Sequence, residues 1–324
     1  TRPRILNVQF AALFLVSVLA FAVAKPIILY GEQHKYKDKI VYQEQTRYQK
    51  IVVTQWKEDY WLFINGSTQF STYDEERYHE PLVHPLMGLI KERKDILLLG
   101  GGDGLAAREI LKYPDVENLT LVDLDPAMTR LARQDTIFLS INQGSLNDPR
   151  VRVVNQDAYQ FIKNSGDLYD AVIIDLPDPK SVSLSLLYSL GFYKMVEKHL
   201  KPFGSMVTQS TSPLYSPEAF LCIKKTMEAA GFSTVPYQNS VPSMGQWGWV
   251  IGVRHEAMPA QRLKQELLTL EFADIETRFF NRDAMISMAH FGKGLFEKEA
   301  QIEPNTQFDH NILKYYRQGS WDLY

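Results

Sequence analysis

The chain has 324 residues, of which 45% are hydrophobic and 23% are charged, enough to bury one large core or two smaller ones. A net charge of −3 and a pI near 6.2 give no support to nucleic-acid binding. The single cysteine, Cys222, excludes an internal disulfide and a multi-cysteine zinc site, and its apolar helical surroundings indicate a buried small side chain.

The first part of the chain is apolar. Because it begins with Thr, we take it as a fragment or a processed product. Residues 10–24 form an uncharged, mostly apolar run of 15 residues, whereas a bilayer span needs ~20. A signal peptide is the alternative, since Ala22-Val23-Ala24 imitates a cleavage site. Basic residues lie on both sides of the run and favour a cytoplasmic downstream domain only weakly. We expect residues 1–35 to be a transmembrane or juxtamembrane segment, the last helix of a truncated set.

A strand pattern follows this segment. Residues 41–46, 48–54 and 60–64 alternate and are rich in β-branched and aromatic side chains, and Asn65-Gly66 is a strong hairpin turn. Residues 36–75 are therefore expected to form a small antiparallel β domain.

From residue 76 to residue 255 strand and helix patterns alternate, which predicts a doubly wound α/β domain. The remaining residues, 256–324, form a charged and aromatic C-terminal extension with one helical stretch and no assignable chemistry. The expected strands are residues 96–99, 119–122, 151–154, 171–174, 205–209, 233–237 and 247–253; the expected helices are residues 78–91, 105–112, 126–138, 186–199, 217–230 and 259–270.

A glycine-rich loop, Gly100-Gly101-Gly102-Asp103-Gly104, connects the first of these strands to a helix. Glycines permit the tight turn, and the helix N-terminus offers free N–H donors to a ligand. Loops of this kind usually bind an anion, but this one carries its own carboxylate, Asp103. We therefore expect a nucleoside-like ligand that has a cationic tail.

Acidic residues also follow the next parallel strands. Asp123 lies about 20 residues after the glycine loop, the usual position of an acid that binds ribose hydroxyls. Asp157-Ala158 follows the third strand, where a carboxylate can accept from an adenine amine. Asp175 and Asp178 follow the strand at 171–174, and they favour a second, cationic ligand. Any one of these acids alone is more simply a solvated loop residue or a helix cap, but capping alone does not explain acids at four successive strand ends.

The motifs together resemble the polyamine aminopropyltransferases, the spermidine and spermine synthase family. The resemblance covers roughly residues 45–253, and the Asp-Leu-Pro-Asp-Pro form, with the apolar N-terminus, is most similar to bacterial members that carry N-terminal membrane helices. It rests on Tyr48-Gln49, residues 63–69, Asp74-Glu75-Glu76-Arg77-Tyr78-His79-Glu80, the loop 100–104, Asp148-Pro149-Arg150-Val151, Asp157-Ala158, residues 175–179, Leu187-Tyr188 and Phe192-Tyr193.

The resemblance implies a Rossmann-like (class I methyltransferase-like) sheet and transfer of an aminopropyl group from decarboxylated S-adenosylmethionine, a co-substrate, to a di- or polyamine. No resident cofactor is implied. Asp175 would take a proton from the acceptor amine, Asp178 would hold the amine chain, and Tyr78 would position the reacting nitrogen. Asp103 suits the ammonium tail of the donor. The donor's nucleoside would be held by Gly100, Gly102, Asp103, Asp123, Asp157 and Ala158.

Weaker assignments follow from the same resemblance. Gln49 and Gln69 match positions that line the nucleoside-thioether pocket, and His79 would hydrogen-bond the donor's tail. A metal site at His79 and His84 is not expected, because their spacing exceeds that of the zinc-protease signature and Pro81 lies between them.

One departure from the family concerns the acceptor. Putrescine-specific members usually have Tyr-Pro-Ser-Gly where this chain has Val241-Pro242-Ser243-Met244-Gly245, without the tyrosine. Trp247 or Trp249 can supply an aromatic face to an alkylammonium, or both can be core residues. Which amine is the acceptor stays open. Two alternatives also stay open, an S-adenosylmethionine-dependent methyltransferase and a non-catalytic polyamine-binding protein. We further expect a homo-oligomer at the inner membrane with its catalytic domain in the cytoplasm.

Overall fold

The structure, a computed structural model, describes residues 2–321, with side chains for residues 9–20 and 30–321. The chain divides into two units. The first contains the residues up to Gln45 together with Lys50–Gln69, and the second contains Thr46–Gln49 together with the chain from Phe70 onward.

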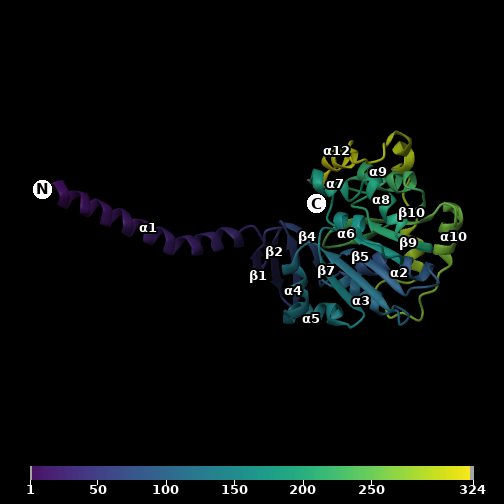
Figure 1. The fold of residues 1–324 in the computed structure, drawn as a ribbon, viewed down its shortest axis with the longest axis horizontal. Coiled ribbons are helices and arrows are strands. Elements are labelled where there is room, and N and C mark those ends of the chain that lie inside the picture. Colours follow the sequence, from purple (N-terminus) through teal and green to yellow (C-terminus); the bar gives the residue numbers. More distant parts are fainter. Residues whose placement is uncertain (1, 322–324) are drawn as a thin grey trace. The chain divides into compact units, whose positions relative to one another are not determined.

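The first unit consists of one helix and most of a small antiparallel sheet (Figure 1). The hairpin turn at Asn65-Gly66 forms as predicted. Both residues have the positive φ that this turn requires, 52° and 82°. The small β domain is therefore confirmed as a sheet, with one strand, β4, beyond those predicted. Its strands follow chain order, and the elements are α1 (Arg2–Gln33), β1 (Lys39–Gln45), β2 (Lys50–Trp56), β3 (Asp59–Ile64) and β4 (Ser67–Ser71).

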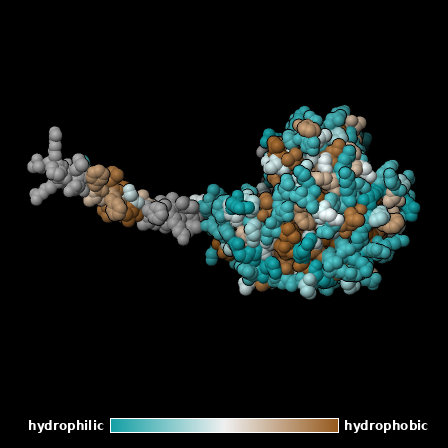
Figure 2. Space-filling view, viewed as in Figure 1, coloured by the Kyte–Doolittle hydropathy of each residue, from teal (hydrophilic) through white to brown (hydrophobic). Residues whose placement is uncertain are grey.

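The apolar run 10–24 lies within α1, and its described side chains include the exposed Phe10, Leu13 and Phe14. Figure 2 shows hydrophobic side chains on the surface of the described part of this helix. Within the described part of the chain, no helix is long and apolar enough to cross a membrane. This finding contradicts the predicted membrane span and the inner-membrane location that depended on it. A span needs ~20 predominantly apolar residues, and Lys25 and Pro26 directly follow the apolar run.

The second unit contains a seven-stranded mixed sheet of order β10-β11-β9-β8-β5-β6-β7. The five strands from β9 to β7 run parallel, and β11 runs antiparallel to both β9 and β10. This confirms the predicted Rossmann-like sheet. The strands are β5 (Asp95–Gly100), β6 (Asn118–Asp123), β7 (Val151–Asn155), β8 (Tyr169–Asp175), β9 (Leu200–Gln209), β10 (Phe232–Val241) and β11 (Gly245–Arg254).

The central strands are apolar on both faces because both faces are covered. Leu97 and Leu99 join a core cluster with Phe192 from a neighbouring helix, while Ile96 and Leu98, on the opposite face of β5, are also fully buried. The strand order reverses between β5 and β8, which makes this the topological switch point where ligands bind in such sheets.

The predicted helix at residues 126–138 is broken in two, and the one predicted at residues 186–199 starts later, at Leu190. Asp135 ends one helix and caps the next by accepting from the amides of Ile137 and Phe138, and Ser189 caps a new helix in the same way. The helices of this unit are α2 (Glu76–Leu89), α3 (Leu105–Leu111), α4 (Pro126–Gln134), α5 (Thr136–Asn142), η1 (Ser145–Asn147), α6 (Ala158–Asn164), α7 (Val182–Leu186), α8 (Leu190–Lys198), α9 (Pro217–Ala229), α10 (Ala260–Thr269), α11 (Arg282–Met288), η2 (Leu295–Gln301) and α12 (Asn311–Arg317).

The C-terminal extension has more structure than predicted. Besides α10 it contains α11, η2 and α12, and α12 packs against α9 and α7. Ile312 and Tyr316 of α12 belong to the main core cluster, so this segment is built into the fold.

Candidate active site

The acids predicted at the strand ends lie along one edge of the sheet. Because β5, β6, β7 and β8 are parallel neighbours, their C-terminal ends face the same side. Asp103, Asp123, Asp157 and Asp175 come at or directly after these four ends. The edge therefore carries a row of carboxylates on both sides of the switch point.

The glycine loop permits very close contacts at this edge. A Cβ added to Gly100, which has φ +85°, would lie 2.0 Å from the backbone oxygen of Asp175. A Cβ added to Gly102 would lie 2.5 Å from Asp123 Oδ2. Glycine is therefore favoured at both positions. At Gly100 the reasons are the positive φ and the contact with the Asp175 backbone, and at Gly102 the reason is the contact with the Asp123 carboxylate.

Asp123 is held by the loop. Its Oδ2 accepts from the Gly102 amide at 3.1 Å, and its Oδ1 accepts from the Asp125 amide at 2.9 Å. Burial raises the pKa of Asp123 to about 6, with a further contribution from the nearby Asp103 carboxylate. A partly buried carboxylate whose orientation is fixed in this way is suited to accepting hydrogen bonds from a diol.

Asp157 and Ala158 begin α6. Asp157 is the N-cap, and its Oδ1 accepts from the Gln160 amide at 2.9 Å; Ala158 is buried. Capping explains the position of Asp157, so its contact with an adenine amine stays a prediction.

The centre of the edge is a hydrogen bond between two elements. The Tyr78 hydroxyl, on α2, donates to Asp175 Oδ1 at 2.7 Å. Burial raises the pKa of Asp175 to about 6. The His79 cation opposes this rise, and the Asp103 carboxylate adds to it. Burial and the Asp175 carboxylate raise the pKa of Tyr78 well above its ordinary value, so Tyr78 stays protonated and acts as the donor.

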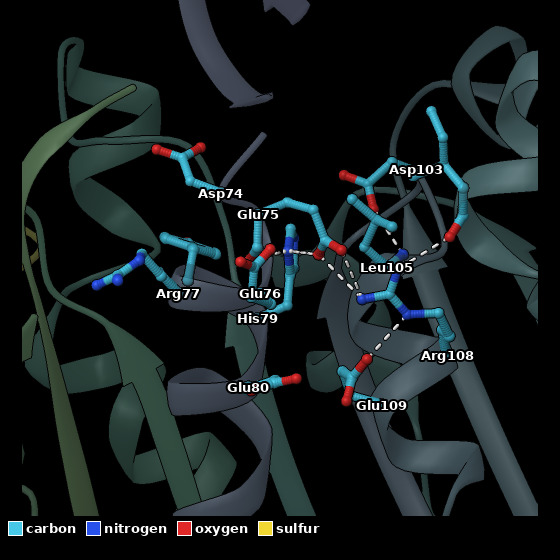
Figure 3. A network of polar contacts seen from close by, with 12 residues as sticks. Asp74, Glu75, Glu76, Arg77, His79, Glu80, Asp103, Leu105, Arg108 and Glu109 are labelled. Atoms are coloured by element: carbon cyan, nitrogen blue, oxygen red, sulfur yellow. Dashed lines mark hydrogen bonds and ion pairs between the residues drawn. The ribbon is translucent and has the colours of Figure 1, made fainter. Parts of the chain in front are cut away.

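His79 belongs to a buried charge network on α2 and α3 (Figure 3). Its Nδ1 lies 3.0 Å from Glu75 Oε2, and the Arg108 Nη2 atom donates to both oxygens of that carboxylate at 2.9 and 3.0 Å. Burial lowers the pKa of His79, but the Glu75 carboxylate outweighs it, and Asp103 and Asp175 add to the effect, so that the pKa rises to about 9. His79 is therefore a cation at neutral pH.

Asp103 lies at the N-terminus of α3. Its Oδ1 accepts from the Leu105 amide at 2.8 Å. Burial raises the pKa of Asp103, and the cations of His79 and Arg108 oppose the shift. Because the carboxylate also raises the pKa of His79, the two groups are electrostatically coupled.

Asp178 has partners from two other parts of the chain. The Tyr316 hydroxyl, on α12, donates to its Oδ2 at 2.9 Å, and Gln209 Nε2, at the end of β9, lies 3.5 Å from its Oδ1. Gln209 also accepts from Trp247 Nε1 at 3.3 Å. Burial raises the pKa of Asp178, and the bonds from Tyr316 and Gln209 oppose the rise.

The two tryptophans are buried in β11 and also lie near the centre of the site. The ring of Tyr78 is 6.3 Å from that of Trp247 and 5.5 Å from that of Trp249. They are thus core residues that also form an aromatic wall beside Tyr78.

The two predicted glutamines lie in different units. Gln49 is in a turn of the second unit, where its amide donates to Thr46 Oγ1 at 3.0 Å. Gln69 is in the first unit, where its side-chain amide donates to the carbonyls of Ser67 and Thr68. Their contact with a nucleoside stays a prediction.

His84, the other histidine considered for a metal, is engaged within the protein. Its Nε2 lies 2.9 Å from Glu109 Oε2, and its Nδ1 lies 3.1 Å from the Tyr113 hydroxyl. It is fully buried and contributes to the network beneath the site.

Four residues of this site were not predicted from the sequence: Glu75, Arg108, Gln209 and Tyr316. Glu75 lies within one of the quoted motifs and Arg108 lies shortly after the glycine loop, and their opposite charges were a usable signal. Gln209 and Tyr316 gave no signal, because their contacts with Asp178 depend on how distant segments pack.

Comparisons with known proteins identify the family. The family model described as "Spermine/spermidine synthase domain" matches residues 75–265. A polyamine aminopropyltransferase of Oceanobacillus iheyensis is 41% identical over 295 residues, covering 90% of this chain and 56% of the relative. Polyamine aminopropyltransferase 2 of Aquifex aeolicus is 40% identical over 312 residues, covering 95% of this chain and 60% of the relative.

The chain thus spans little more than half the length of these curated relatives. Among solved structures, the spermidine synthase of Thermotoga maritima superposes with a TM-score of 0.69 at 23% identity, over 82% of this chain and 88% of that one. A spermidine synthase in complex with the transition-state analogue AdoDATO gives a TM-score of 0.71 at 23% identity, over 82% of this chain and 89% of that one. These two similarities concern the fold.

Proposed function

This chain belongs to the spermine/spermidine synthase family, and from that premise we propose that it transfers an aminopropyl group from decarboxylated S-adenosylmethionine to a di- or polyamine. The products are the extended polyamine and 5′-methylthioadenosine. The observation that carries the proposal is the Tyr78–Asp175 hydrogen bond of 2.7 Å at the switch point of the sheet, with Asp103 and Asp178 as further, partly buried carboxylates. Cationic substrates offset the cost of burying these charges.

The donor lies over the glycine loop in this proposal. Gly100 and Gly102 allow close approach, Asp123 accepts from the ribose hydroxyls, and Asp157-Ala158 adjoins the adenine. Asp103 binds the ammonium that ends the donor's tail. S-adenosylmethionine itself would place an amino-acid carboxylate near Asp103, and this like-charge contact disfavours the methyltransferase alternative.

The reaction is a single displacement. The acceptor arrives as an ammonium and must lose a proton before its nitrogen can attack. Asp175 takes that proton, and its pKa of about 6 makes it a stronger base than an ordinary aspartate while it stays ionised at neutral pH. The nitrogen lone pair then forms a bond to the methylene next to sulfur, and the C–S bond breaks with its electron pair going to sulfur. Alignment supplies most of the acceleration, because a sulfonium is already a good leaving group.

Tyr78 and Asp178 position the acceptor. The Tyr78 hydroxyl orients the Asp175 carboxylate and lies next to the reacting nitrogen, while Asp178 holds an ammonium further along the amine. His79 takes part through its charge and its free ring nitrogen. Nδ1 is engaged by Glu75, so Nε2 is the atom that can face the donor's tail. Nε2 accepts from the tail's ammonium only when the imidazole is neutral, so the expected hydrogen bond requires that donor binding displaces the His79 proton. Its cation also compensates Asp103 and Asp175 before the substrates arrive.

A mass-spectrometric product assay tests the proposal. The protein is offered decarboxylated or intact S-adenosylmethionine with a panel of di- and polyamines. We expect an amine extended by one aminopropyl group and 5′-methylthioadenosine, only with the decarboxylated donor. A methylated product would support the methyltransferase. Amine binding without any product would support a non-catalytic polyamine-binding protein. The expected homo-oligomer stays a prediction for light scattering.

A further inference from the structure

The C-terminal helix α12 reaches one of the carboxylates of the site. Its Tyr316 hydroxyl donates to Asp178 Oδ2 at 2.9 Å, across 138 positions of the sequence. Tyr316 is 6% exposed and lies outside residues 75–265, the part matched by the family model. Tyr316 therefore lies outside the matched family domain but contacts Asp178, the carboxylate to which we assign binding of the acceptor amine.

The contact is held in place from several sides. Trp321 Nε1 donates to the backbone oxygen of Tyr316 at 2.8 Å, and the two rings lie 4.5 Å apart. Upstream, the side-chain amide of Asn305 donates to the carbonyls of Ser185 and Tyr188 at 2.7 and 3.1 Å. Tyr316 is thus ordered by the fold itself, so little conformational entropy is lost in holding the Asp178 carboxylate.

The second partner of Asp178 is also fixed. Gln209 Nε2 donates to the Leu176 carbonyl at 2.7 Å and lies 3.5 Å from Asp178 Oδ1, so its bond to Asp178 is the weaker one. The Tyr316 hydroxyl is therefore the stronger of these two constraints on the carboxylate.

We propose that Tyr316 is a positioning residue of the acceptor-amine subsite, whose hydroxyl holds the Asp178 carboxylate in the orientation that binds an ammonium group of the amine. The inference rests on the proposed function and assigns a role to the C-terminal extension. Hydrogen bonds to a carboxylate favour its charged form, and here they oppose the rise that burial causes in the pKa of Asp178. Lys180 acts in the same direction, while the neighbouring hydroxyls of Tyr188 and Tyr78 stay neutral.

Steady-state kinetics of Tyr316→Phe test the inference. The substitution removes only the hydroxyl, so we expect the KM for the amine to rise about tenfold, the loss typical of one charge-assisted hydrogen bond. The turnover at saturating amine and the KM for the donor should stay within about twofold, because Asp178 acts on the ground state and the transition state alike. Tyr315→Phe is the matched control: this tyrosine is on the same helix, but its hydroxyl accepts from the Glu303 amide at 3.2 Å.

A double-mutant cycle with Asp178→Asn separates positioning from a general structural effect. If Tyr316 acts through Asp178, adding Tyr316→Phe to Asp178→Asn should raise the KM for the amine by much less than tenfold. An unchanged KM in Tyr316→Phe, an equal change in Tyr315→Phe, an equal loss of donor affinity, or full additivity in the cycle would each overturn the inference.

Calorimetry keeps the two proposals distinguishable. Putrescine and spermidine are titrated into the wild type and Tyr316→Phe in the presence of 5′-methylthioadenosine. If the wild type forms no product, the proposed function fails, yet tenfold weaker amine binding by the variant still supports the subsite. Equal amine binding by both proteins overturns the subsite even if turnover is normal.

Discussion

Asp175→Asn should make the ligand-free protein more stable while it removes activity. Burial raises the pKa of Asp175 from 3.8 to about 6, a difference of roughly 2 units that corresponds to about 3 kcal/mol at ~1.4 kcal/mol per unit. At neutral pH the folded state carries this cost, because the carboxylate is ionised in surroundings that favour its neutral form. Asparagine is neutral and keeps an oxygen that can accept from Tyr78, so the variant loses the cost and retains the hydrogen bond.

The sign of the pH dependence follows from the raised pKa. Below about pH 4 the carboxyl is protonated in both states, so the wild type and the variant differ little in free energy of unfolding. As the pH rises from about 4 to about 7, the unfolded state ionises first and the wild type loses up to about 3 kcal/mol relative to the variant. From about pH 7 up to the range in which His79 loses its proton, near pH 9, the difference stays constant.

Denaturant unfolding at a series of pH values measures this difference. Asp274→Asn is the control, since Asp274 is exposed and its replacement should leave the free energy of unfolding unchanged at every pH. In the product assay Asp175→Asn should lower turnover about 100-fold or more, the range for loss of a general base. Higher pH should partly restore it, because more of the amine then arrives deprotonated. A variant less stable than the wild type, a pH-independent difference, or near-normal turnover at neutral pH would refute the reasoning.

Three further predictions concern the neighbouring groups. Gly102→Ala places a Cβ 2.5 Å from Asp123 Oδ2, so we expect 5′-methylthioadenosine to bind at least about tenfold more weakly in calorimetry. The control Gly166→Ala, whose Cβ meets open space, should bind it normally. Equal affinities in both variants would contradict the close approach of Gly102 to Asp123. Asp103→Asn should narrow the preference for the decarboxylated donor over S-adenosylmethionine, and equal affinities for the two donors in the wild type would disprove the role of Asp103. The His79 imidazole should titrate by NMR at about pH 9, and Glu75→Gln should move this pKa down toward 6.5. Because the pKa is raised, the stabilisation from the His79–Glu75 pair is complete below about pH 6.5 and is lost as the pH rises through 9. A wild-type pKa near 6.5 would exclude the pairing.

The strand ends and their acids could be located from the sequence. Apolar runs such as Ile96–Leu99 are long enough for buried parallel strands, and the residues directly after a strand in such a sheet lie at its ligand-binding edge. Turns could be predicted at glycines such as Gly66 and Gly100 because glycine tolerates positive φ, which both residues adopt in the structure. These features depend on a few neighbouring residues, so their pattern is visible without the fold.

Helix boundaries were harder to predict from the sequence. Asp135 and Ser189 interrupt patterns that are apolar enough to continue, and each side chain caps a new helix instead. The N-terminal segment shows the same limit: its composition predicted a membrane span, but no helix in the described part of the chain is long and apolar enough to cross a membrane.

By itself the sequence determined the sheet, the glycine loop and the acidic edge, because periodicity, glycine and strand-end position act locally. Tertiary structure alone decided which groups act together. Arg108 meets Glu75 across 33 positions, and Tyr316 meets Asp178 across 138. It also decided the charge of each group, since burial raises the pKa of Asp175 whereas the Glu75 carboxylate keeps His79 cationic. Contacts and desolvation arise only when distant segments pack, and no local pattern encodes them.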